Sequence, residues 1–117
     1  MAFQFENLHV WQKALELSEI VNTISQKFPK EELFILTSQI KRAADSTVLN
    51  IAERSQGQSK AEFRRFLGIA MRSGIEVVSC IFIAKTRNII SEEDFNLIYD
   101  KEEELTKMIQ GLRKSLE

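Results

Sequence analysis

The sequence predicts an all-α protein, an antiparallel up-down-up-down four-helix bundle that forms a single domain over residues 1–117. Apolar residues recur at spacings of three and four through four long segments, which is the period of an amphipathic helix. No stretch shows the strict alternation of apolar and polar residues that is typical of a strand. The breaks between the segments are short, so consecutive helices are expected to pack as antiparallel neighbours.

The first helix is predicted over residues 8–27, with Asn7 as its N-cap. Trp11 falls on its apolar stripe and is interpreted as a packing anchor rather than a platform for stacking a base. Phe28 and Pro29 end the helix, because the residue before a proline disfavours the helical conformation.

The second helix is predicted over residues 30–54, and two rows of side chains run along it. One row is apolar and is expected to face the core: Leu33, Ile40, Ala44, Val48 and Ile51. The other row is polar and consists of Gln39, Arg42, Ser46, Asn50 and Glu53. Ser and Asn side chains compete with the backbone for hydrogen bonds, so this row differs from an ordinary solvated face of Lys and Glu. Most of the functional interpretation depends on it.

The third helix is predicted over residues 60–87, opened by a capping box of Ser59 and Glu62. Gly74 costs roughly 1 kcal/mol of helix propensity in this interior, which indicates a packing reason for its presence. Apolar residues also lie on nearly the opposite side of the helix: Ile69, Cys80 and Ile83. Because one bundle core cannot bury opposite sides of a single helix, these three residues predict an interface between subunits.

The fourth helix is predicted over residues 92–116, after a left-handed C-cap at Asn88 and an N-terminal cap at Ser91. Its apolar stripe includes Phe95, Ile98, Leu105 and Ile109. The charged run over residues 100–104 is interpreted as a solvated face.

Composition excludes several classes of function. The only histidine is His9, which excludes histidine-based metal sites and makes a catalytic Ser-His or Cys-His pair untenable; the glycines form no phosphate-binding loop. We therefore expect no catalytic residues, no metal and no cofactor, and hence no enzyme. Cys80 is the only cysteine, and the start of the chain is unlike a signal peptide. The longest apolar run, residues 77–84, is shorter than the ~20 residues of a membrane span. These features predict a cytoplasmic protein without a membrane partner.

The chain resembles a known family in several motifs. These are Leu36-Thr-Ser-Gln-Ile-Lys-Arg-Ala43, Asn50-Ile-Ala-Glu53, Phe66-Leu-Gly-Ile-Ala70 with Ser73 and Glu76, Leu8-His-Val-Trp11, and the Phe28-Pro29 to Glu32 junction. It is similar to the four-helix-bundle proteins encoded by intervening sequences in bacterial 23S rRNA genes. The resemblance implies a cytoplasmic bacterial homo-oligomer, commonly a ring of five. It also implies an analogy with a related bundle protein that binds a reverse transcriptase and nucleic acid in diversity-generating retroelements.

Two positions depart from the family pattern. Arg54 stands where the family usually has Gly after the Ala-Glu pair, so the second helix is expected to continue further here. The family tends to have Arg-Gly-Ser before the acid of the third helix, whereas this chain has Met71-Arg72-Ser73, and its small residue is Gly74. We therefore expect the close helix contact to shift by part of a turn.

The first hypothesis for function is an oligomeric scaffold or adaptor without catalysis. In it, the polar row forms a seam with Ser73 and Glu76 of the third helix, inside the bundle or between subunits. Arg42 is expected to pair with Glu76. If that pair is buried, Arg42→Ala should destabilise the protein by roughly 3–5 kcal/mol, against ~0–1 kcal/mol for an exposed pair. A solvated polar row is the alternative.

The second hypothesis is an RNA- or DNA-binding accessory protein that uses a basic surface of the oligomer. Residues 30–90 carry a net charge of +4, although the whole chain has a net charge of −1. The candidate contacts are Lys41, Arg54, Lys60, Arg64, Arg65 and Arg72. The overall charge and the lack of aromatic residues between these cations weigh against it.

Overall fold

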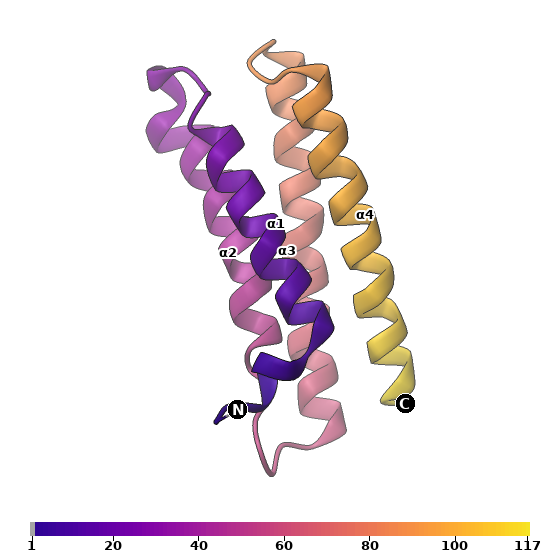
Figure 1. Cartoon of the computed structure of the whole chain (residues 1–117). Helices are drawn as coiled ribbons and strands as arrows, with labels where there is room; N and C mark the ends of the chain where they lie inside the picture. The colour runs from indigo at the N-terminus through magenta and orange to yellow at the C-terminus, as the bar shows by residue number, and fades with distance from the viewer. Residues whose placement is uncertain (1) are drawn as a thin grey trace.

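Residues 2–117 are described by a computed structural model, in which four α-helices account for most of the chain. Their bounds are His9–Ser25 for α1, Ser38–Ile51 for α2, Lys60–Thr86 for α3 and Glu92–Ser115 for α4. Residues 2–117 contain no strand, so the all-α fold class is confirmed. In Figure 1 each helix runs opposite to the one before it, and the elongated bundle measures 46 × 24 × 20 Å.

The four helices enclose one apolar core. Each helix packs against the next along the chain, and α1 also packs against α4, which closes the bundle. Every helix contributes side chains that are fully buried, among them Val21 of α1, Ile40 of α2, Leu67 and Ile81 of α3, and Ile98 of α4. The three-and-four spacing of apolar residues therefore specifies a shared interior, as an amphipathic pattern requires.

The start of the second helical segment differs from the prediction of one regular helix over residues 30–54. A 3₁₀ helix spans Lys30–Glu32, a π-helix spans Leu33–Thr37, and regular α-helix begins only at Ser38. A π-turn changes which side chains face the core, because its hydrogen bonds span one residue more than those of an α-helix. Leu36 and Thr37 are buried in consequence, and Leu33, which the sequence placed in the core, is exposed.

The end of α2 also differs from the prediction. The helix ends at Ile51, so the expected extension toward Arg54 is wrong. The side chain of Gln58 folds back and donates a hydrogen bond of 2.8 Å to the carbonyl oxygen of Glu53. Gly57 adopts a φ of 80°, a left-handed conformation that favours glycine. The hydrogen bond from Gln58 and the left-handed turn at Gly57 thus accompany the end of α2.

Three of the four expected helix caps are present. The hydroxyl of Ser59 accepts a hydrogen bond of 3.1 Å from the backbone of Glu62, and that of Ser91 accepts one of 3.0 Å from Asp94. Asn88 has the predicted left-handed conformation, with a φ of 58°. The expected N-cap at Asn7 is wrong, because Gln4–Asn7 form a 3₁₀ helix and Leu8 precedes α1.

Helix α3 is by length and composition apolar enough to cross a bilayer, which the sequence reading did not expect. Core helices of soluble proteins can have the same length and apolar composition. Here Leu67, Val77 and Ile81 are fully buried against the rest of the bundle. The apolar character of α3 therefore accords with its contacts to both α2 and α4.

Candidate functional site

The polar row of α2 forms hydrogen bonds along its boundary with α3. Gln39 Nε2 donates to Glu76 Oε2, and the hydroxyls of Ser46 and Ser73 are 2.9 Å apart. Asn50 Nδ2 donates to the backbone oxygen of Ser46 at 2.8 Å and to its hydroxyl at 3.1 Å. The structure thus joins four of the seven residues predicted for the seam across the α2–α3 boundary, whereas Asn50 bonds only to Ser46 of its own helix.

Arg42 and Glu53 do not belong to this hydrogen-bonded boundary. Both residues are exposed in the single chain. Arg42 Nη2 donates to the hydroxyl of Ser38 at 3.2 Å. The predicted pair with Glu76 is wrong, because the ion pairs among residues 2–117 do not include it, and Glu76 accepts a hydrogen bond from Gln39. The large penalty expected for Arg42→Ala therefore does not apply to the single chain, since no buried ion pair is broken.

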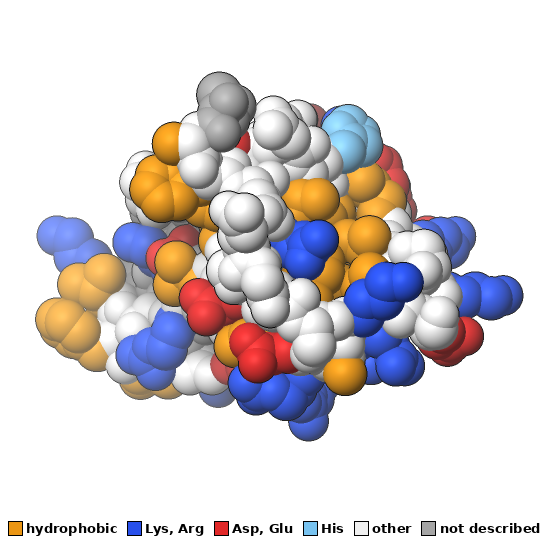
Figure 2. Space-filling view, turned by 90° about the horizontal axis from the view of Figure 1, so that it is seen from below, with side chains coloured by type: hydrophobic (Ala, Val, Ile, Leu, Met, Phe, Trp, Pro, Cys, Tyr) orange, Lys and Arg blue, Asp and Glu red, His pale blue; other side chains and the backbone are white. Residues whose placement is uncertain are grey.

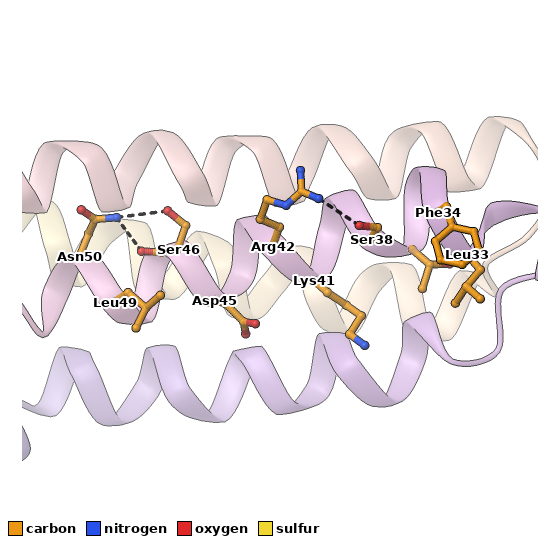
Figure 3. A pocket seen from close by; sticks show the side chains of 10 residues that line it. Leu33, Phe34, Ser38, Lys41, Arg42, Asp45, Ser46, Leu49 and Asn50 are labelled. Carbon is orange, nitrogen blue, oxygen red and sulfur yellow. Dashed lines mark hydrogen bonds between the residues drawn. The ribbon is translucent and has the colours of Figure 1, made fainter.

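A groove of about 650 Å³ follows the outward face of α2. In Figure 3, Lys41, Asp45 and Leu49 point toward α1, whereas Arg42, Ser46 and Asn50 point toward α3. Its walls include Leu33, Phe34 and Leu49. Phe34 is 89% exposed and Leu49 65% exposed, so each end of the groove presents a large apolar side chain to solvent.

The three apolar residues predicted for a subunit interface on α3 lie in different environments. Cys80 is only 3% exposed and belongs to the core, so its assignment to an outward face is wrong. Burial raises the pKa of the Cys80 thiol to about 11, with a smaller contribution from Glu76. Ile69 is half-buried and Ile83 is exposed. Two of the three residues therefore remain available for contact with another molecule.

Ile69 and Ile83 share one side of α3 with Glu76, because the three residues follow at intervals of seven, which is close to two helical turns. Glu76 contacts Gln39 of α2, so this side of α3 borders α2. We define the α2–α3 face as the exposed residues Leu33, Phe34, Ile35 and Leu49 of the second helical segment, of which Leu49 lies on the side toward α1, together with Ile69 and Ile83 of α3. The polar row of α2 runs through this face.

The six basic residues proposed for nucleic-acid binding do not form one patch. Arg54, Lys60, Arg64 and Arg65 flank the loop between α2 and α3, whereas Lys41 lines the groove and Arg72 lies further along α3. Figure 2 shows the end of the bundle seen from below, where basic side chains are spread around the edge with acidic ones between them.

Two of the loop-flanking arginines contact aromatic rings. The guanidinium carbon of Arg54 lies 5.1 Å from the ring centre of Phe63, and that of Arg65 lies 4.5 Å from the ring centre of Phe66. Such cation–π contacts hold each guanidinium over a ring of the protein itself.

Glu102 of α4 is a feature that the sequence analysis missed. It is 2% exposed, although it lies within the run interpreted as a solvated face. Neither of its carboxyl oxygens has a hydrogen-bond partner within residues 2–117, and burial raises its pKa to about 7. The sequence does indicate this burial through its spacing, because Glu102 takes a core position in the series Phe95, Ile98, Glu102, Leu105 and Ile109.

Gly74 of α3 provides the space for this carboxyl group. A Cβ atom added at Gly74 would lie 2.7 Å from Glu102 Oε2 and 3.0 Å from Cδ. The sequence correctly indicated a packing reason for Gly74, and the group packed against it is an acidic side chain. The pair borders a pocket of about 290 Å³ between α3 and α4.

Comparisons with known proteins support the family and the fold of this chain. The family model described as 23S rRNA-intervening sequence protein matches residues 6–111. A crystal structure of a protein with unknown function from the S23 ribosomal protein family, from Bacteroides thetaiotaomicron, is similar with a TM-score of 0.80 and 28% sequence identity. That similarity covers 90% of this chain and 98% of the other. No curated protein matches the sequence.

Proposed function

This chain belongs to the 23S rRNA-intervening sequence protein family, and on that premise we propose that it is a non-enzymatic, cytoplasmic scaffold that self-associates. The proposed assembly is a ring of five copies, which is the number that the family resemblance implies. Copies meet through the α2–α3 face. The protein acts by presenting repeated surfaces to a partner rather than by catalysis.

The exposure of large apolar side chains on the α2–α3 face carries this proposal. Leu33, Phe34, Ile35 and Leu49 all leave more than half of their surface in water, and three of them are consecutive in the π-helix. Burying apolar surface is favourable by about 25 cal/mol per Å², so four such side chains provide a substantial driving force for association. The groove also holds Lys41, Arg42 and Asp45, which offer charges of both signs to a second copy.

Phe34→Glu is expected to dissociate the assembly, because it introduces a charge where the interface requires an apolar contact. Light scattering at micromolar concentration should give the mass of a single chain, while circular dichroism shows unchanged helix content. The matched control is Leu97→Glu on α4, which changes an exposed leucine outside this face and should leave the mass unchanged. A wild-type protein that is itself monomeric would refute the proposal.

The alternative function is an accessory role in which the oligomer binds RNA or DNA. Its support is the group of four cations around the loop between α2 and α3, which an assembly would present in several copies. An analogy with the retroelement accessory bundle proteins points in the same direction.

If the alternative is correct, a generic single-stranded RNA should bind at low salt, and affinity should fall steeply as salt rises, because phosphate contacts release counterions. The double variant Lys60→Gln/Arg65→Gln should weaken binding and reduce the salt slope. Lys85→Gln, an exposed charge at the opposite end of α3, serves as the control. Fluorescence anisotropy at two salt concentrations measures both quantities, and no binding at low salt excludes this function.

A further inference from the structure

The pocket between α3 and α4 combines apolar walls with one buried acidic group. Ile75 and Val78 of α3 and Tyr99 and Thr106 of α4 form much of its lining, and Glu102 lies in it with Gly74 beside the carboxyl group. The volume of about 290 Å³ is at the small end of the range for ligand pockets. It therefore suits a small ligand or a single side chain.

The carboxyl group of Glu102 lacks any partner of its own. Both oxygens are buried and accept no hydrogen bond from residues 2–117. Glu102 also lines a small enclosed space together with Leu17 and Ser18 of α1 and Ala44 and Thr47 of α2, which carry no charge. The charged residues that share the pocket are Glu103 and Lys107, both exposed. Nothing in the described chain neutralises this acid.

Two departures from ordinary core packing occur side by side here. An unpartnered acid occupies a core position of α4, and a glycine in the middle of α3 makes room for it. Each is unfavourable for stability alone, because an unpaired buried polar group and a mid-helix glycine both cost free energy. Local departures of this kind are expected where a site is retained for binding.

The chemistry of the lining selects the ligand. A divalent metal ion is a poor fit, because Ca²⁺ requires six to eight oxygen ligands and the pocket offers one buried carboxylate among apolar walls. An alkylammonium group matches both features, since it donates up to three hydrogen bonds to the carboxyl oxygens and its carbon chain packs on the walls. The ring of Tyr99 adds an aromatic surface suited to a cation.

We propose that the α3–α4 pocket binds a primary alkylammonium group, with the carboxylate of Glu102 as its counter-ion and Gly74 as the residue that admits the carboxylate to the site. The group could belong to a free aliphatic amine or to a lysine side chain of another protein. This proposal does not depend on self-association.

The test is a titration of the ¹⁵N-labelled protein at pH 8 with n-butylammonium chloride, followed through the amide signals of residues 74–78 and 99–110. The Glu102 carboxyl, with a pKa of about 7, is mostly ionised at this pH. Saturable shifts confined to these segments are expected for the wild type and for Glu104→Gln, an exposed acid on the same helix. Glu102→Gln should weaken binding at least tenfold, and Glu102→Asp should retain part of it.

Two further probes complete the design. n-Butanol has a similar size and no charge, and it should bind at least tenfold more weakly than n-butylammonium. Nα-acetyl-lysine methylamide presents the same group on a peptide backbone, so its affinity relative to n-butylammonium separates a lysine side chain from a free amine as the source. The proposal is overturned if neither amine gives saturable shifts, if n-butanol binds equally well, or if Glu102→Gln binds n-butylammonium as tightly as the wild type while circular dichroism shows it folded. A failure here leaves the mass measurements on Phe34→Glu unaffected.

Discussion

The free energy of unfolding is expected to fall by roughly 3 kcal/mol between pH 4.5 and pH 7, as a result of Glu102 alone. Burial raises the pKa of this carboxyl from 4.5 to about 7 in the folded protein. In this window the folded state retains a proton that the unfolded chain has lost. Each unit of difference in pKa corresponds to about 1.4 kcal/mol.

This dependence of stability on pH has the opposite direction to the one caused by a carboxylate that a salt bridge stabilises. The unfolded chain binds fewer protons than the folded protein between the two pKa values, so stability decreases as pH rises. Well below pH 4.5 the contribution of Glu102 to stability is fully present, because its carboxyl is protonated in both the folded and the unfolded state. Above pH 7 it is lost, because the folded protein must then hold an unpaired buried charge.

Urea unfolding at pH 5 and pH 8, at one protein concentration, measures this effect. Glu102→Gln keeps the shape of the side chain but cannot ionise, so most of the difference between the two pH values should disappear. Glu104→Gln changes an exposed acid two residues away and should retain the wild-type difference. If Glu102→Gln and the wild type show the same pH dependence, the carboxyl is not desolvated as the structure indicates.

Gly74→Ala is expected to destabilise the protein by up to about 2 kcal/mol, although alanine is the better helix former. The new Cβ would lie 2.7 Å from Glu102 Oε2, so the carboxyl group must leave its packed position. Overpacking of a core costs typically about 1–3 kcal/mol, which equals or exceeds the gain of about 1 kcal/mol in helix propensity.

The same substitution should have the opposite sign when the acid is absent. In a Glu102→Ala background the space beside Gly74 is empty, so Gly74→Ala should stabilise the protein by about 1 kcal/mol through helix propensity. Chemical unfolding of the four proteins completes a double-mutant cycle, which isolates the coupling between the two positions. Additive effects would show that the carboxyl group does not lie against Gly74.

The seam between α2 and α3 was predictable only in part. Ser46 and Asn50 stand out in the sequence because they are poor choices for a solvated helix face; Ser46 does bond to Ser73 of α3, and Asn50 bonds to Ser46. The partner of Arg42 could not be inferred in this way. A long side chain can reach several neighbours, and the position of Gln39 decides that Glu76 bonds to the amide instead.

The sequence by itself determined the four helices and most of their ends. Apolar spacing and caps such as Ser59 and Ser91 act over a few residues, so they can be interpreted without knowledge of the rest of the fold. Only the tertiary structure decided which side chains are enclosed. Cys80 lies inside, Leu33 lies outside after the π-turn, and Glu102 is buried against Gly74. The physical reason is that burial depends on how neighbouring helices are rotated and packed, a relation between segments far apart in the chain that local spacing indicates only in part.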